Sequence, residues 1–428
     1  MDDDDRKYVE ISKETWRRLL EGYGKRNFNI RFWNGEVWEA EEKPDFTLVL
    51  NHPGSLRAAM LPPTELNLAE AYLYGDIDIE GKIEAIFPVA DFVMNNGPRL
   101  IDKLGLARLL MSLPKKKKPR VGKREPARLK GKKHSRERDR LAVTYHYNLP
   151  NEFYSLWLDK NMVYSCAYFR RGDESIDDAQ ENKLEYIARK LRLKPGERLL
   201  DIGCGWGSFV VHAAKKYGVR AYGITLSENQ VEWAKEWIER EGLSDLCTVE
   251  LRDYRDLDGV EEFDKIVSIG MFEHVGEKML GEYFGRAYRL LKPGGLFLNH
   301  GIARHIRNVR TGEKTFSDTY VFPDGELEPI SLTLRVAEEK NFEVRDVESL
   351  REHYARTLRL WVERLEERHD EAVRVTDEVT YRVWRLFMSG SAYGFETGRL
   401  NLYQTLLSKP DKGGRTYLPL TREDLYVL

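Results

Sequence analysis

The chain is poor in cysteine and in long apolar runs. Its 428 residues contain only three cysteines, Cys166, Cys204 and Cys247, which are too few for a disulfide scaffold and fit a reducing cytoplasm. No run approaches the roughly 18 apolar residues of a membrane span. The first residues, MDDDDRKY, are acidic and lack the apolar core of a secretory signal. These absences predict a cytoplasmic protein of two or three domains.

Charge is distributed unevenly along the chain. Residues 114–140 contain fourteen Lys or Arg residues against three Asp or Glu residues, a net charge of about +11, while the remainder carries about −13. A stretch this basic, with three prolines and few apolar residues, does not fold alone. We therefore interpret residues 114–141 as a linker between an N-terminal domain (1–113) and a C-terminal domain (142–428).

The segment before the linker has the apolar spacing of an amphipathic helix, residues 99–113. Such a helix followed by a polybasic run predicts binding to anionic lipid, and hence a peripheral membrane protein. The alternative is a core helix followed by a solvated tether. Nucleic acid is not an expected partner, because the basic run has no aromatic residue for base stacking.

The N-terminal domain has the pattern of a small α+β fold. Residues 28–40 read as a hairpin with Asn34-Gly35 at its turn, residues 46–52 as a further strand, and residues 66–74 as a helix. It has no paired carboxylates and no metal-ligand spacing, and no metal site is expected in the chain. Packing, dimerisation and lipid contact all stay open as its role.

A glycine-rich stretch carries the clearest chemical signal. An apolar strand ends at Asp201, then Gly203, Gly205 and Gly207 follow, and an amphipathic helix comes next. The glycines permit a tight strand-to-helix turn and close approach of the backbone to a ligand. Strand and helix continue to alternate afterwards. This pattern predicts a Rossmann-like, doubly wound and mostly parallel α/β sheet with its ligand at the carboxyl ends of the strands.

The spacing of the glycines narrows the ligand class. It is G-x-G-x-G, whereas dinucleotide folds use G-x-G-x-x-G. With LKPGG about 90 residues later, the pattern resembles class I S-adenosylmethionine methyltransferases, and a nucleotide-binding oxidoreductase is the alternative. One feature departs from the class: Thr225 and Leu226 stand where an acidic residue usually binds the ribose hydroxyls, and Glu228 and Gln230 follow.

Further motifs make the resemblance more specific. From about residue 143 onward the chain resembles the cyclopropane-fatty-acyl-phospholipid synthase family, which includes the mycolic acid cyclopropane synthases. The matching segments are VTYHYNLPNEFYSLWLD, YSCAYF, LDIGCGWG, GITLSENQ, RDYRDL, GMFEHVG, NHGI, YVFPDGELEP and HYARTLRLW. The resemblance implies methyl transfer from S-adenosylmethionine to a cis double bond of a phospholipid-bound acyl chain, followed by proton loss and closure of a cyclopropane ring. It also implies a homodimer.

This chemistry needs alignment more than a protein nucleophile. An alkene is weakly nucleophilic, and the sulfonium is a strong electrophile held at near-attack distance. Methyl addition leaves a carbocation, which aromatic faces stabilise and a base then deprotonates. A protein carboxylate touching the cation would trap it as an ester, whereas a small bound anion avoids that outcome.

The resemblance implies that this anion is bicarbonate. The candidate catalytic residues that would hold it are the backbone groups of Cys166 and Ile302 and the side chains of Glu273, His300 and Tyr354. Taken singly, each also fits an ordinary structural role. Because Glu273 would lie beside a second anion, either its pKa is raised or His300 is cationic. We expect Glu273 to accept a hydrogen bond from the bicarbonate.

The same resemblance assigns the cofactor contacts. They lie at the methionine end, the glycine turn, the ribose and the adenine, in the pairs Tyr164 and Ser165, Gly203 and Gly205, Thr225 and Gln230, Asp253 and Tyr254. Asp201 is expected to steer the amino group of the cofactor through the turn. Tyr254 has a competing interpretation as a core residue.

The acyl chain needs an apolar tunnel and a cover. Residues 304–395 are too long for a simple connection in this fold, and we interpret them as a helical lid with a helix at 359–367. The candidate tunnel residues are aromatic: Phe169, Phe272, Tyr320, Phe322, Trp361, Tyr393, Phe395 and Tyr403.

Three other functions stay open at this point. The first is methylation of the same alkene without ring closure, which gives a methylene or methyl-branched fatty acid. The second is amine N-methylation, which the polybasic stretch and the additional N-terminal domain disfavour. The third is a non-enzymatic, lipid-tethered binding module, which the intact LDIGCGWG motif disfavours.

Overall fold

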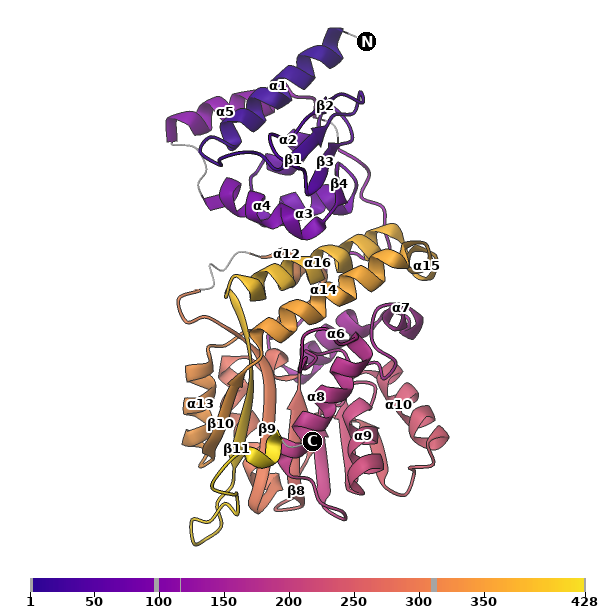
Figure 1. Cartoon of the computed structure of the whole chain (residues 1–428), viewed down its shortest axis with the longest axis vertical. Coiled ribbons are helices and arrows are strands. Elements are labelled where there is room, and N and C mark those ends of the chain that lie inside the picture. The colour runs from indigo at the N-terminus through magenta and orange to yellow at the C-terminus, as the bar shows by residue number, and fades with distance from the viewer. Residues whose placement is uncertain (1–2, 96–99, 116, 309–313, 427–428) are drawn as a thin grey trace. The chain divides into compact units, whose positions relative to one another are not determined.

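The computed structural model describes residues 3–95, 100–115, 117–308 and 314–426. The chain divides into two compact units, of which the first comprises Met1–Pro126, Gly312–Val321 and Ala372–Tyr393. The second comprises Ala127–Thr311, Phe322–Glu371 and Gly394–Leu428 (Figure 1). The basic stretch 114–141 is therefore shared between the units, and two segments of the C-terminal part belong to the first unit. No helix among these described residues is long and apolar enough to cross a bilayer.

The first unit is built on a four-stranded sheet of order β2-β1-β3-β4. Its strands are β1 (Phe28–Arg31), β2 (Val37–Trp38), β3 (Phe46–Leu50) and β4 (Ile77–Gly81). The predicted hairpin is confirmed, since β1 and β2 pair antiparallel with Ile30 opposite Trp38. Gly35 at its turn has φ +86°, a conformation that favours glycine.

The helices of the first unit are α1 (Asp3–Leu19), α2 (Ser55–Met60), α3 (Glu65–Leu73), α4 (Ile86–Asn95), α5 (Leu100–Ser112) and the short α12 (Phe316–Tyr320). The helices predicted at 66–74 and 99–113 are thus confirmed, with small shifts of their ends. In α5, Leu110 is buried, whereas Leu104 and Met111 are exposed.

The segment Ala372–Tyr393 joins the first unit through two arginines. It includes most of α16 (Glu378–Glu396). The Arg382 guanidinium lies 2.8 Å from the Asp78 carboxylate and donates to the Tyr72 carbonyl at 2.9 Å. Buried Arg385 donates to the Tyr72 hydroxyl at 3.0 Å. Because buried guanidinium groups must be paired, these contacts explain why a late segment packs with the N-terminal one.

The second unit carries a seven-stranded sheet of order β10-β11-β9-β8-β5-β6-β7. The strands are β5 (Arg198–Ile202), β6 (Arg220–Thr225), β7 (Cys247–Leu251), β8 (Phe263–Ile269), β9 (Leu291–Arg304), β10 (Glu343–Ser349) and β11 (Leu400–Ser408). The five strands from β9 to β7 are parallel, and β11 and β10 add antiparallel to the β9 edge. The mostly parallel α/β sheet predicted from the sequence is confirmed.

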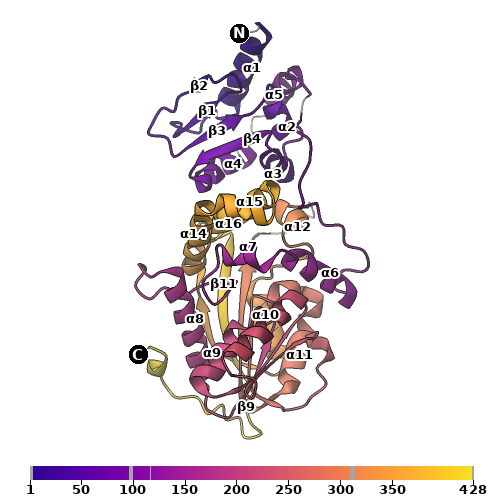
Figure 2. The ribbon, with the colours of Figure 1, turned by 90° about the vertical axis from the view of Figure 1, so that its right-hand side faces the viewer.

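Helices cover both faces of this sheet. They are α6 (Arg136–Tyr147), α7 (Asn151–Ser155), α8 (Ile176–Leu191), α9 (Ser208–Tyr217), α10 (Glu228–Arg240), α11 (Leu280–Leu290), α13 (Ile330–Glu339) and α14 (Arg351–Glu367), with α15 (His369–Val375) following. One apolar core packs α8, α9 and α10 against the sheet, and another packs α11 and α13. Figure 2 shows α8 on the opposite side of the sheet from α11. The carboxyl ends of the parallel strands stay free of these helices and hold the site.

Two expectations need correction. The segment 304–395 is not a lid throughout, because α13 packs on the sheet and β10 pairs with β11 along six residue pairs. The alternating burial of an edge strand with a polar outer face hides β10 in the sequence. Residues 309–313 of this segment lie outside the described residues. The basic stretch is not all linker either, since its last residues begin α6.

Candidate active site

The glycine turn shapes the floor of the candidate cofactor pocket. It joins β5 to α9, and Gly203, Gly205 and Gly207 have φ +82°, +56° and +87°. A Cβ on Gly203 would lie 2.6 Å from the Met271 Cβ, whereas a Cβ on Gly205 would meet no atom within 4 Å. Gly203 therefore serves close packing, and Gly205 opens its backbone toward the cavity.

A cavity lies beside this turn. Its lining includes all nine residues assigned to the cofactor: Tyr164, Ser165, Asp201, Gly203, Gly205, Thr225, Gln230, Asp253 and Tyr254. They come from the segment before α8, from the ends of β5 and β6, and from the turn after β7. The parallel strands β5, β6 and β7 end at one edge of the sheet, which is why residues far apart in sequence meet there.

The ribose and adenine candidates are already hydrogen-bonded within the protein. The Thr225 hydroxyl donates to Gln230 Oε1 at 2.7 Å. Asp253 accepts from the Arg255 guanidinium at 2.6 and 2.9 Å, and this contact, offsetting the burial that acts the other way, lowers the pKa of Asp253. The Tyr254 ring lines the cavity and also packs edge-on against Tyr283, so both of its interpretations hold.

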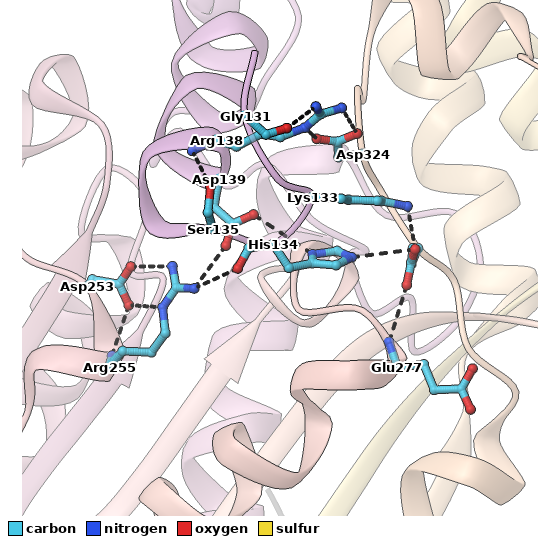
Figure 3. Close-up of polar contacts among 11 residues, drawn as sticks. Gly131, Lys133, His134, Ser135, Arg138, Asp139, Asp253, Arg255, Glu277 and Asp324 are labelled. Atoms are coloured by element: carbon cyan, nitrogen blue, oxygen red, sulfur yellow. Dashed lines mark hydrogen bonds and ion pairs between the residues drawn. The ribbon is translucent and has the colours of Figure 1, made fainter. Parts of the chain in front are cut away.

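The sequence analysis missed part of the lining. Asp139 and Tyr147 of α6 line the cavity, as do Lys183 and Arg255. The Arg255 guanidinium lies between two carboxylates, 2.6 Å from Asp253 and 3.1 Å from Asp139 (Figure 3). Because α6 begins inside the stretch interpreted as a linker, nothing in its composition indicated a pocket wall.

The turn before α6 is fixed to the second unit by ion pairs. His134 lies between Asp139 and Glu326, at 3.8 and 3.4 Å, and Lys133 also pairs with Glu326. Arg138 binds Asp324 (Figure 3). These contacts use basic charge from residues 131–140 inside the folded unit, and they hold the start of α6 at the cavity.

Glu273 and Ile302 meet beside the cavity, at the carboxyl ends of β8 and β9. Glu273 belongs to a short 3-10 turn after β8, and Ile302 lies near the end of β9. The Ile302 backbone N–H donates to Glu273 Oε1 at 2.7 Å. Glu273 Oε2 is buried and has no hydrogen-bond partner among the residues that the structure describes. The N–H that the resemblance assigned to an anion is thus given to Glu273 in this structure.

Burial decides the charge of this pair of candidates. Burial raises the pKa of Glu273 to about 7, and the Ile302 N–H partly opposes the rise. His300 is fully buried, and burial lowers its pKa well below the ordinary value. Of the two sequence alternatives, the structure therefore favours a raised pKa of Glu273 with neutral His300. Gln404 Nε2 lies 3.2 Å from His300 Nδ1 and donates to it, which leaves the proton on Nε2.

Cys166 and Tyr354 complete the group. The Cys166 thiol is buried and donates to the Leu350 carbonyl at 3.7 Å, one helical turn before Tyr354. Burial raises the pKa of both side chains, so both are neutral. Negative charge on Cys166 and on Glu273 acts on the Tyr354 hydroxyl, which brings these three groups within electrostatic range. None of the five candidates lines the cofactor cavity itself.

An aromatic cluster connects the two groups of candidates. Tyr164, which lines the cofactor cavity, has its ring 5.5 Å from that of Trp361. Trp361 lies 6.1 Å from Tyr354, and Tyr354 lies 4.7 Å from Phe395. These rings surround the region between cofactor and anion candidates with apolar faces, as a carbocation requires.

The predicted tunnel residues fall into separate groups. Trp361 and Phe395 belong to the aromatic cluster, whereas Phe272 packs in the core beside α11. Tyr320 belongs to the first unit, where its hydroxyl lies 3.0 Å from those of Tyr74 and Glu70. Tyr393 bonds Asp91 in that unit at 2.9 Å. The structure therefore does not gather the eight aromatics into one tunnel.

The residues present fit both expected groups. For the cofactor, Asp201 Oδ1 is buried in the cavity wall without a hydrogen-bond partner in the described parts of the chain, as an ammonium acceptor would be. For the anion, Glu273 Oε2 and His300 Nε2 are buried and lack partners there as well. A buried polar atom without a partner is costly, so each of these atoms is suited to a ligand.

Comparison with known proteins gives the family context. The family described as mycolic acid cyclopropane synthetase matches residues 134–405, and one described as a domain of unknown function matches residues 15–95. A probable fatty acid methyltransferase of Pseudomonas putida is 40% identical over 93% of this chain and 95% of its own length. The cyclopropane-fatty-acyl-phospholipid synthase of Escherichia coli K12 is 37% identical over 65% of this chain and 71% of its own. The solved structure of mycolic acid cyclopropane synthase CmaA1 complexed with SAH and CTAB is 33% identical with a TM-score of 0.60, covering 63% of this chain and 97% of that one.

Proposed function

Since this chain belongs to the mycolic acid cyclopropane synthetase family of S-adenosylmethionine-dependent enzymes, we propose that it converts a cis double bond of a phospholipid-bound fatty acyl chain into a cyclopropane ring. The observation that carries the proposal is the aromatic cluster of Tyr164, Tyr354, Trp361 and Phe395 between the cofactor cavity and Glu273. Amine methylation needs no such water-free surface around a carbocation.

Each group of residues has a separate task in this proposal. S-adenosylmethionine supplies an electrophilic methyl carbon when bound. Gly205 and the walls of the cavity fix its position, which provides the alignment that a weakly nucleophilic alkene requires. The rings of Tyr164, Trp361 and Phe395 exclude water from the reacting carbons and stabilise positive charge through their faces.

We further propose that a bicarbonate ion accepts the proton that leaves the transferred methyl group. His300 Nε2–H donates one hydrogen bond to this ion, and the Tyr354 hydroxyl donates another. Glu273 Oε2 accepts the hydrogen of the bicarbonate when ionised, which raises the basicity of the ion. A pKa of about 7 lets Glu273 hold this charge state near neutral pH. The neutral thiol of Cys166 takes no part as a nucleophile.

We also propose that anionic phospholipid binds the first part of the basic stretch 114–140. Lys115, Lys117 and Lys118 are exposed, and Leu104 and Met111 on α5 expose apolar side chains just before them. Changing the three lysines to Gln should weaken binding to phosphatidylglycerol vesicles at least tenfold, because each contributes about 1 kcal/mol near such a surface. Exposed lysines elsewhere provide a control of equal charge: Lys43, Lys235 and Lys278. Equal loss in both triple variants would remove the stretch from lipid binding.

A second candidate function is methylation of the same alkene without ring closure. The relative named a probable fatty acid methyltransferase favours it, since the similarity extends over both units of this chain. The two functions share the cofactor cavity and the aromatic cluster. They differ in whether the proton is lost from the transferred methyl group or from a neighbouring carbon.

The test of the proposal uses vesicles of defined acyl composition. The full chain is incubated with methyl-labelled S-adenosylmethionine and vesicles of either cis-unsaturated or fully saturated phospholipid, with identical head groups. We expect label in the unsaturated lipid alone. Buffer depleted of carbon dioxide should slow transfer, and added bicarbonate should restore it. Equal labelling of saturated lipid would contradict the proposal, and indifference to bicarbonate would contradict its base.

A further inference from the structure

Helix α8 carries polar side chains on its buried face. Ile176, Ala179, Leu184 and Ile187 form the apolar stripe that packs toward the sheet. Gln180 and Lys183 occupy positions on this same stripe and are 0% and 1% exposed. Burying an amino group costs free energy unless a partner compensates, so Lys183 requires an explanation beyond helix packing.

The amino group of Lys183 reaches the cofactor cavity. Its Nζ donates to the Ser165 hydroxyl at 2.9 Å, and both residues line the cavity. Gln180 fixes this strand of chain by donating to the Ser165 carbonyl at 2.9 Å. No carboxylate oxygen lies within 4.0 Å of the Lys183 Nζ in the described parts of the chain. Burial lowers the pKa of Lys183 to about 8, while Asp159 and Asp201 oppose this.

A carboxylate in the same wall is equally incomplete. Asp201 Oδ1 is buried without a hydrogen-bond partner, as described above, and burial raises the pKa of Asp201 to about 7. The cavity thus presents one cation and one anion that are not bonded to each other. An α-amino acid group carries the complementary pair of charges on neighbouring atoms.

We propose that Lys183 binds the α-carboxylate of the methionine part of the cofactor, with the Ser165 hydroxyl beside it and Asp201 facing the α-ammonium. The binding of a carboxylate supplies the ionic partner that Lys183 lacks. The proposal rests on S-adenosylmethionine as the cofactor and is independent of the acyl substrate, so a failure of one does not entail a failure of the other.

Three ligands separate the carboxylate from the rest of the cofactor. Calorimetric titration of the full chain would compare S-adenosylhomocysteine, its decarboxylated analogue and 5′-methylthioadenosine, which lacks the whole amino acid group. We expect the wild-type chain to bind the decarboxylated analogue at least 10-fold more weakly than S-adenosylhomocysteine, as for the loss of a charge-assisted hydrogen bond. Equal affinity for these two ligands would overturn the proposal.

The Lys183→Met variant assigns the difference to this residue. It should bind S-adenosylhomocysteine and the decarboxylated analogue alike, with unchanged affinity for methylthioadenosine, which reports an intact cavity. Lys183→Arg keeps a cation and should restore part of the discrimination. A variant that discriminates as the wild type does, or loses affinity for all three ligands equally, would contradict the proposal.

A second buried lysine on the same helix provides the structural control. Lys190 is as buried as Lys183 but forms ion pairs with Asp346 and Glu348. Lys190→Met leaves these carboxylates without their cation, so it should lower the melting temperature and leave ligand discrimination unchanged. Lys183→Met leaves no such partner and should not lower the melting temperature of the ligand-free chain. A melting temperature as low as that of Lys190→Met would assign Lys183 a structural role instead.

Discussion

Replacing Glu273 with Gln should make the protein more stable and less active. The difference between the ordinary pKa of 4.5 and the raised value of about 7 corresponds to roughly 3 kcal/mol that the folded protein loses when this buried carboxyl ionises. Gln is neutral and nearly isosteric, and its Oε1 still accepts the hydrogen bond from Ile302. Glu273→Gln therefore removes the cost of the charge without leaving a cavity.

The sign of the effect depends on pH. Below pH 4.5 the carboxyl is protonated in both folded and unfolded chains, so wild type and variant should be equally stable. Between pH 4.5 and about 7 the unfolded chain ionises first, and the wild type loses stability as pH rises. Above pH 7 the full difference is present, and the variant should melt about 5–10 °C higher.

The assay combines thermal melting at pH 4.5, 6 and 8 with turnover on unsaturated vesicles. Turnover of Glu273→Gln should fall at least tenfold while cofactor affinity stays nearly constant, because the amide nitrogen cannot accept the bicarbonate hydrogen. Glu277→Gln, at an exposed glutamate nearby, is the matched control and should change neither property. A variant with wild-type turnover, or one that is less stable than wild type at pH 8, would refute the reasoning.

Three further predictions concern the thiol, the pocket wall and the glycine turn. Cys166→Ser keeps a hydrogen-bond donor and should change turnover less than threefold, since a neutral buried thiol is not a nucleophile; a loss of tenfold or more would contradict this. Arg255→Leu leaves the Asp253 carboxylate without its cation, and should cost about 3 kcal/mol of stability and weaken cofactor binding in calorimetry. Gly203→Ala should destabilise the chain in denaturant titration because its Cβ has no space, whereas Gly205→Ala should be milder for stability.

The sequence predicted the parts of the fold that local patterns encode. The strand ending at Asp201 and the helix after it form β5 and α9, because the glycines and the apolar periodicity are local signals. All nine cofactor residues were predictable from motifs and line one cavity. The family could be recognised for the same reason, since its motifs are short and contiguous.

Other features depend on tertiary contacts that no local pattern reports. The last turn of the basic stretch becomes part of α6 only because Asp256, Asp324 and Glu326 supply partners for its cations. β10 is a half-exposed edge strand and has no apolar run. Lys183 could have been noticed, because a lysine on the apolar stripe of an amphipathic helix departs from the expected pattern.

The most direct test of the central claim is the position of the transferred carbon. S-adenosylmethionine with a carbon-13 methyl group and cis-unsaturated phospholipid vesicles would be incubated with the full chain, and the extracted lipid would be analysed by NMR. We predict the label in a ring methylene whose protons lie upfield of all other acyl signals. Label in a methyl branch or an exocyclic methylene would support the second candidate function, and label on a head-group nitrogen would contradict the account.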